Sequence, residues 1–154
     1  MIATAPGAKL IYDGQIEGRK VKLPVFLARR PPEVRDDALV AFYRSLLSTI
    51  HSDLFHEGEW HLCDRHGWPD NASFHDIVAW TWRLGVERTL VVVNLADHPS
   101  QAMVQLPWDD LRGRTWRLVE TLNWECYVRD GDELSTQGLF VDLDAWRYHF
   151  LKFE

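Results

Sequence analysis

Hydrophobic and polar positions follow two different periods along this chain of 154 residues. From about residue 34 to residue 51, apolar side chains recur at intervals of three and four, which predicts an amphipathic helix. Pro31 and Pro32 exclude an earlier start, and two acidic residues in the first turn suit the positive end of the helix dipole. The expected apolar face consists of Leu39, Phe42, Tyr43, Leu46, Leu47 and Ile50.

After Gly58 the period shortens to that of β-strands, with turn signals between the apolar stretches. Short strands at this spacing, with no helical pattern between them, predict an antiparallel β-sandwich. The chain therefore divides near residues 51–58 into a segment 1–55 and a β-sandwich domain 56–154. The expected strands are 59–63, 76–84, 88–95, 102–106, 116–122, 126–129, 139–143 and 146–153.

The first segment has the order strand, loop and helix. The apolar residues Leu10–Tyr12 predict a strand at about 9–13, followed by a polar turn with Gly14 and Gly18. A strand followed by a helix is half of a βα unit, and parallel strands occur in sheets that are covered on both faces. Residues 1–55 are therefore expected to be the tail of a larger α/β domain whose earlier strands are not in this chain.

The sequence "PGAKLIYDGQIEG" at residues 6–18 resembles the last barrel strand of the α-amylase family of glycoside hydrolases. Pro6, Gly7, Gly14 and Gln15 match that strand, whereas Ile16 stands where the family commonly has glutamate and Glu17 follows one place later. "LPVFLARRPPE" resembles a barrel-end loop, and "DDALVAFYRSLLSTI" resembles the last barrel helix. The stretch from "IVAWTWRL" through "LVVVNL" to "MVQLPW" resembles the first half of the C-terminal β domain.

This resemblance implies a mainly β fold, an antiparallel β-sandwich preceded by a strand–loop–helix remnant of a (β/α)8 barrel. It also implies that the catalytic carboxylates lie on the fourth, fifth and seventh barrel strands, which precede this segment. The chain is therefore expected to be catalytically inert alone and to stabilise the barrel of its parent enzyme. Two alternatives stay open, namely a free-standing carbohydrate-binding module and a structural or oligomerisation module.

Four residues are candidates for contact with substrate. Gln15 and Glu17 follow the expected strand, at the end where barrel active sites form, although a role in tying down the loop explains them better, because one strand end does not build a site. Trp68 in "HGWPDN" and Trp124 in "LNWEC" are the tryptophans with the best prospect of exposure. Trp80 and Trp82 share one face of a strand and are better explained by packing in the core.

Other chemistry finds little support. His61, Cys63 and His66 lie close in sequence but lack a second ligand pair with zinc-site spacing, so neither a metal nor a cofactor is expected. Cys63 and Cys126 do not form a disulfide framework and are expected to be reduced.

The net charge of −6 argues against a nucleic-acid partner. No signal peptide and no apolar run of membrane-spanning length is visible, so a cytoplasmic location without membrane contact is expected. The partners left to consider are an α-glucan or oligosaccharide, the rest of the catalytic barrel, and a second copy of this chain.

Overall fold

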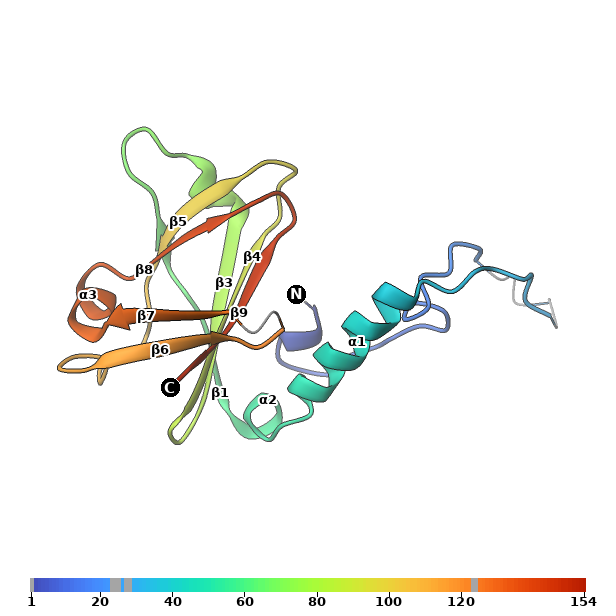
Figure 1. Cartoon of the computed structure of the whole chain (residues 1–154), viewed down its shortest axis with the longest axis horizontal. Helices are drawn as coiled ribbons and strands as arrows, with labels where there is room; N and C mark the ends of the chain where they lie inside the picture. The colour runs from blue at the N-terminus through green and yellow to red at the C-terminus, as the bar shows by residue number, and fades with distance from the viewer. Residues whose placement is uncertain (1, 23–25, 27–28, 123–124) are drawn as a thin grey trace.

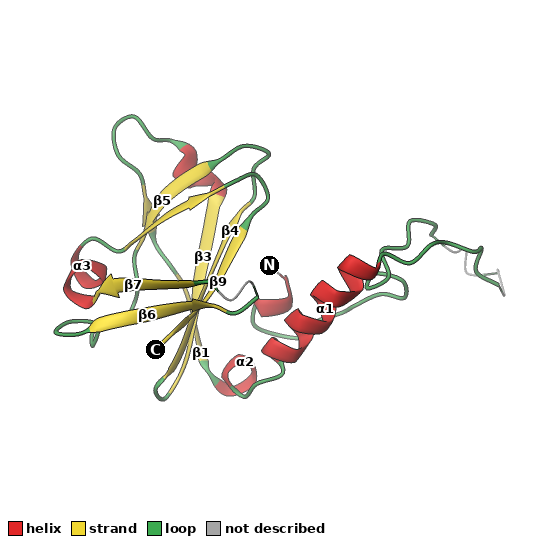
Figure 2. Cartoon of the chain, viewed as in Figure 1, coloured by secondary structure: helices red, strands yellow, loops and turns green. Residues whose placement is uncertain are grey.

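The computed structural model describes residues 2–22, 26, 29–122 and 125–154. The N-terminal part of the chain carries the long helix, and the remainder consists mainly of strands with short helices among them (Figure 2). The helices are η1 (Ile2–Thr4), α1 (Asp37–Ile50), α2 (Leu54–Glu57), η2 (Ser73–Asp76) and α3 (Gly131–Thr136). The strands are β1 (Glu59–Leu62), β2 (Arg65–His66), β3 (Ile77–Leu84), β4 (Glu87–Asn94), β5 (Ser100–Val104), β6 (Thr115–Glu120), β7 (Cys126–Asp130), β8 (Leu139–Leu143) and β9 (Tyr148–Phe153).

The strands form two antiparallel sheets, which confirms the predicted mainly β fold with an antiparallel β-sandwich. The larger sheet has the order β1-β3-β4-β9-β6-β7 and the smaller sheet has the order β2-β5-β8. As expected for the apolar run Leu90–Val93, β4 is an inner strand, paired with β3 on one side and β9 on the other. In this register Val91 lies between Trp80 and Phe150. The chain thus places large apolar side chains of three strands side by side.

The main core lies between the two sheets. Ile77, Ala79, Leu90 and Val92 of the larger sheet are fully buried there, because successive side chains of a strand point to opposite faces. Ala102, Val104, Leu139 and Val141 supply the facing layer from β5 and β8. The other face of the larger sheet is covered by the helices, which explains why β3 and β4 are apolar on both faces.

A buried arginine closes one end of this core. The Arg88 side chain is 4% exposed, and its guanidinium carbon lies 4.9 Å from the ring centroid of Trp116 and 5.5 Å from that of Trp108. It donates a hydrogen bond to the carboxylate of Asp110, which also lies 3.6 Å from Arg83. The hydrogen bond from Arg88 lowers the pKa of Asp110. This group fastens the segment between β5 and β6 onto the end of the sandwich.

The predicted helix at 34–51 is confirmed as α1. Asp36 caps it, since its side-chain oxygen accepts a hydrogen bond from the backbone nitrogen of Leu39 at 2.9 Å. The helix carries a continuous apolar face, but only Val40 and Ile50 are fully buried. Figure 1 shows that one end of α1 meets the sandwich and that the helix points away from it.

The strand expected at about 9–13 is wrong. Residues 8–12 have no regular secondary structure and residues 13–18 form a turn. Leu10 and Tyr12 are 88% and 62% exposed. A strand needs the backbone hydrogen bonds of a neighbour, and no strand among the described residues pairs with this segment.

Four short helices, η1, α2, η2 and α3, and one short strand, β2, have no counterpart among the expected elements. α2 lies where the period of the sequence changes, and β2 is only two residues long. α3 begins at Gly131, and the side chain of Asp130 before it accepts hydrogen bonds from the backbone nitrogens of Asp132 and Glu133. Only glycine fits at position 131, because an added Cβ would lie 1.9 Å from the carbonyl oxygen of Leu111.

Candidate functional site

The helical segment is joined to the larger sheet by an apolar interface. Phe55 of α2 is 3% exposed, and its ring centroid lies 5.7 Å from that of Trp82 and 5.8 Å from that of Phe150. Ile50 and Leu54 complete the contact from the helical side. The interface therefore connects the end of α1 and the whole of α2 to β3 and β9.

Two tryptophans also bind the N-terminal turn to the sheet. The indole nitrogens of Trp80 and Trp82 both donate to the carbonyl oxygen of Thr4, at 3.1 and 2.8 Å. Both side chains are almost fully buried, so core packing, which was the preferred interpretation, accounts for them. Their i, i+2 spacing does not make an exposed sugar platform here, because η1 and α2 cover that face of the sheet.

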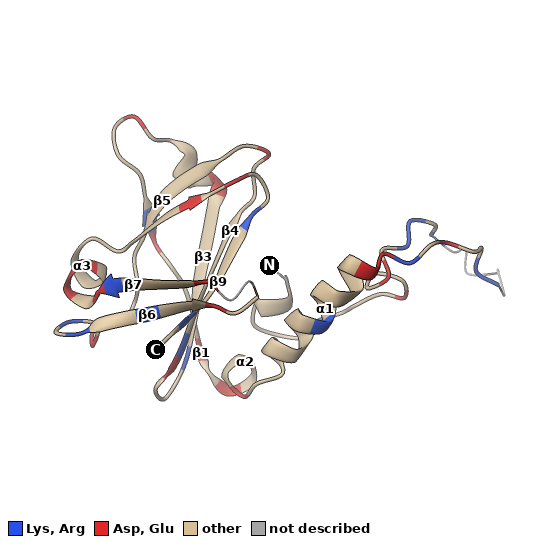
Figure 3. Ribbon diagram, in the orientation of Figure 1, with Lys and Arg blue, Asp and Glu red and all other residues tan. Residues whose placement is uncertain are grey.

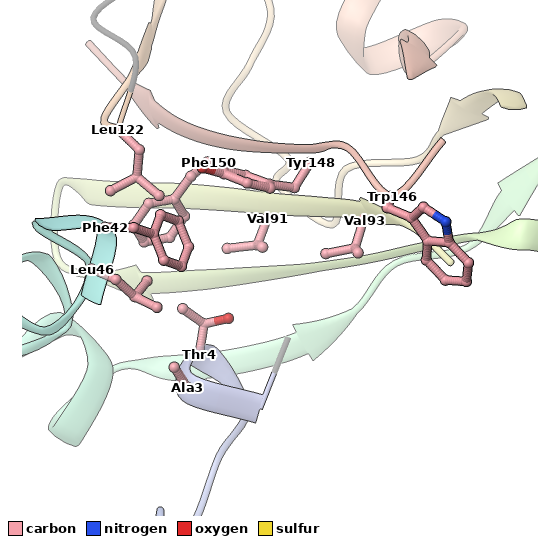
Figure 4. Close-up of a pocket in the computed structure, with 10 residues that line it drawn as sticks. All are labelled: Ala3, Thr4, Phe42, Leu46, Val91, Val93, Leu122, Trp146, Tyr148 and Phe150. Carbon is pink, nitrogen blue, oxygen red and sulfur yellow. The ribbon is translucent and has the colours of Figure 1, made fainter. Parts of the chain in front are cut away.

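A cavity of about 220 Å³ lies beside this interface, between α1, η1 and the strands β4 and β9 (Figure 4). Figure 4 shows Phe42 and Leu46 of α1 at one end and Trp146 at the other. Trp146 is 64% exposed and has a φ of 59°, which is unusual for a large side chain. The remaining lining residues are Ala3, Thr4, Val91, Val93, Leu122, Tyr148 and Phe150.

The chemistry of this cavity is that of an apolar docking site. Among the described residues of its walls no side chain is charged, and burial raises the pKa of the Tyr148 hydroxyl further above its ordinary value of 10.0. General acid or base catalysis needs a group that titrates near the working pH. The described residues of the cavity offer none, and their apolar side chains suit the cavity to accommodate other apolar side chains.

A second candidate surface is formed by two exposed aromatic rings on the smaller sheet. Trp68 is 41% exposed and Phe140 of β8 is 49% exposed, with ring centroids 6.1 Å apart and planes tilted by 40°. Gln101 and Asp142 lie on the same outer face, where the Gln101 amide donates to the Asp142 carboxylate at 2.9 Å. Aromatic faces next to amide and carboxylate groups can contact the apolar and hydroxyl faces of a sugar.

The structure places the four predicted substrate residues in different surroundings. Trp68 is exposed, as expected, whereas Trp124 lies outside the described residues. The Gln15 amide donates to the Tyr43 hydroxyl at 2.9 Å, and the Glu17 carbonyl oxygen accepts from the backbone nitrogen of Asp36. These bonds tie the turn to α1, and a role of Gln15 or Glu17 in binding substrate stays a prediction.

Phe140 is the site residue that sequence reasoning missed. The alternation in "LFVDL" could have revealed it, because Leu139, Val141 and Leu143 point inward and leave Phe140 and Asp142 outward. Its proximity to Trp68 could not be read from the alternation, since that depends on how β2, β5 and β8 pair.

The histidine and cysteine candidates do not converge. In the described part of the chain, no three histidine, cysteine, aspartate or glutamate side chains gather closely enough to hold a metal ion. Cys63 is buried in the core, where burial raises the pKa of its thiol to about 12, while His61 is exposed. Cys63 and Cys126 are not joined by a disulfide.

No helix among the described residues has the length and hydrophobicity needed to span a membrane.

Comparison with solved structures shows where this fold occurs. The chain matches a maltogenic α-amylase, AmyB, from Thermotoga neapolitana with a TM-score of 0.77 and 15% identity, over 99% of this chain and 34% of that one. It matches an Anoxybacillus α-amylase with a TM-score of 0.72 and 13% identity, over 99% and 30% of the two chains. It matches the α-amylase of Geobacillus thermoleovorans with a TM-score of 0.70 and 15% identity, over 99% and 31%.

No protein-family model matches the chain, and no curated protein does. The structural matches lie at identities that establish the fold alone. The chain spans about a third of the length of these α-amylases, and along nearly all of its length it has the fold of the corresponding part of such an enzyme.

Proposed function

We propose that this chain is the C-terminal part of an α-amylase-family glycoside hydrolase, in which the sandwich supports the last elements of the catalytic barrel. The observation that carries the proposal is the match over 99% of this chain to about a third of a maltogenic α-amylase. The order of the sequence motifs at residues 6–18, 36–50 and 77–108 supports the assignment to the C-terminal third.

The exposed apolar surface of the helical segment supports a role in packing against the rest of a catalytic barrel. Leu10, Phe26 and Val34 are each at least 88% exposed, and Phe42 and Trp146 border the open apolar cavity. Exposed apolar groups at this density mark a surface that another protein surface covers. In the proposed parent enzyme, the rest of the barrel covers α1 and these exposed apolar side chains.

The purified chain is expected to hydrolyse neither soluble starch nor a chromogenic maltoside. Retaining glycoside hydrolases need two carboxyl groups about 5 Å apart across the scissile bond. The described lining residues of the cavity above include no carboxylate. The measurement is the release of reducing sugar or chromophore over hours. Turnover that disappears in a Glu17→Gln variant would contradict the proposal and make Glu17 catalytic.

The coding region upstream of Met1 provides an independent test of the same proposal. An open reading frame that encodes the preceding barrel strands is expected. A stop codon close to Met1 would refute the assignment to a longer enzyme and favour a free-standing module.

Contact with α-glucan is a second candidate function, and the surface formed by Trp68 and Phe140 favours it. The two rings are exposed side by side, and Gln101 and Asp142 provide hydrogen-bonding groups on the same face. The surface is on the outer face of the smaller sheet, which leaves the apolar interface of the larger sheet free for the barrel.

Replacing Trp68 with alanine is expected to weaken binding to soluble starch by about tenfold, the effect of losing one well-placed aromatic contact. Affinity electrophoresis of the native chain in starch-containing gels measures this change. Trp146→Ala is the matched control, because Trp146 is also an exposed tryptophan but lies on the far side of the larger sheet beside the helices. Equal retardation of both variants and the wild type would rule out the Trp68 surface as a glucan site.

A further inference from the structure

A second hollow, of about 520 Å³, lies in the turn and loop that precede α1. Its walls are formed by Tyr12 and by four basic residues, Arg19, Lys20, Lys22 and Arg30, together with Asp13 and Val21. Residues 9–30 contain six basic and two acidic side chains, in a chain whose net charge is −6. Figure 3 shows basic positions along this segment, at the end of the molecule away from the sandwich.

The hollow is held in shape by hydrogen bonds. The backbone nitrogen of Arg19 donates to the Gly14 carbonyl at 2.9 Å, and the Glu33 carboxylate accepts from the backbone nitrogens of Lys20 and Val21 at 2.9 and 3.1 Å. Gly14 is buried with a φ of 91°, and an added Cβ would lie 3.0 Å from both Arg19 and Arg30. The turn is therefore built so that two arginines approach the same point of the backbone.

The charges in the hollow are unbalanced. Asp13 is bound by the Arg30 guanidinium, which also lies 3.4 Å from the Asp13 carbonyl oxygen. Arg19, Lys20 and Lys22 form no ion pair within the described part of the chain. The side chain of Glu33 is engaged with the backbone of the loop. The four basic wall residues thus face two carboxylates, that of Asp13 and that of Glu33 beside the wall, which leaves an excess of two positive charges around the hollow.

We propose that this hollow binds the phosphate monoester of a sugar. Arginine and lysine are the groups that bind phosphate oxygens most strongly, through charge-assisted hydrogen bonds. The Tyr12 ring is 62% exposed beside them and offers an apolar face to the ring that carries the phosphate. The volume lies within the range of small-molecule sites. The phosphate requirement follows from the charges alone, whereas the choice of a sugar as the second moiety rests on the proposed function.

Calorimetric titration of the intact chain tests this inference with four probes: glucose 1-phosphate, inorganic phosphate, glucose and adenosine monophosphate. Glucose 1-phosphate is expected to bind most tightly, with an affinity that falls as sodium chloride is added. Glucose without phosphate is expected to show no binding. The double variant Lys20→Gln/Lys22→Gln is expected to lose about tenfold or more in affinity for glucose 1-phosphate. Lys9→Gln is the control, because Lys9 belongs to the same segment but does not line the hollow.

Tyr12→Ala separates the two halves of the site. It is expected to reduce the affinity for glucose 1-phosphate to that for inorganic phosphate and to leave phosphate binding unchanged. The proposed site would be refuted if millimolar glucose 1-phosphate gave no heat of binding, or if Lys9→Gln lost as much affinity as the double variant. If adenosine monophosphate bound more tightly than glucose 1-phosphate, the sugar would be refuted as the moiety that carries the phosphate. Neither result bears on the starch-hydrolysis and reading-frame tests, so failure of this site and failure of the proposed function are distinguishable.

Discussion

Replacing Phe55 with alanine is expected to lower the free energy of unfolding by about 3–5 kcal/mol, the usual cost of truncating a buried phenylalanine. Phe55 is 3% exposed, and its ring packs edge-on against Trp82 and at a tilt against Phe150. Its removal leaves a void at the junction between the helical segment and the larger sheet. Denaturant titration measures the stability, and hydrogen exchange is expected to show faster exchange at the C-terminal turn of α1.

Phe140→Ala is the matched control, because it removes the same side chain from a position that is 49% exposed. Its effect on stability is expected to stay within about 0.5 kcal/mol, as for most surface substitutions. For a chain of this size, the loss at Phe55 corresponds to a decrease in Tm of roughly 6–20 °C. A similar loss of stability in both variants would show that Phe55 has no special role in joining the helices to the sheet.

Replacing Asp110 with alanine is expected to destabilise the chain by about 2–3 kcal/mol at neutral pH. The variant leaves the guanidinium of Arg88 buried without its carboxylate, and breaking a buried ion pair typically costs about 3–5 kcal/mol. The lower figure reflects the 43% exposure of the Asp110 side chain, since water screens that partner. Asp109→Ala is the control at the neighbouring position, where the side chain is exposed and no ion pair is formed among the described residues.

The same pair makes stability depend on pH in a defined direction. The hydrogen bond from Arg88 holds the pKa of Asp110 below its ordinary value of 3.8 in the folded state. The unfolded chain therefore takes up this proton first as the pH falls, and the contribution of the pair is fully present above pH 3.8 and is lost as the pH drops through the folded pKa. Wild type and Asp110→Ala are expected to keep their difference in stability down to about pH 3.8 and to converge as the pH falls below it. A difference that stays constant well below pH 3.8 would exclude an electrostatic origin.

Local sequence patterns predicted an element correctly wherever the residues within that element are enough to specify it. The expected strand at 139–143 coincides with β8, and the other main strands agree within a few residues. The helix was expected at 34–51 and forms at Asp37–Ile50, because its apolar spacing and its Asp36 cap are local properties. The strand at 9–13 failed for the opposite reason, since an apolar triplet forms a strand only where another strand supplies its hydrogen bonds.

The candidate sites depended on tertiary structure to a greater extent. Trp68 could be chosen from its turn, but Phe140 meets it only because the smaller sheet brings the two regions together. Phe55 lies in the short stretch where the helical period gives way to the strand period, so no pattern marks it as the junction. The basic residues of the loop are visible in the sequence. Their arrangement around one hollow depends on backbone hydrogen bonds that the Gly14 carbonyl and the Glu33 carboxylate accept.

The sequence by itself determined the mainly β class, the antiparallel sandwich, the single long helix and the likeness to the C-terminal part of an α-amylase. These properties follow from the spacing of apolar residues and the placement of turn residues, which act over a few positions of the chain. Only the tertiary structure decided that Trp80 and Trp82 bind Thr4, that Arg88 closes the core between two indole rings, and which aromatic rings remain exposed. Such contacts join residues that are distant in sequence, and strand order and helix docking, which no local period encodes, bring them together.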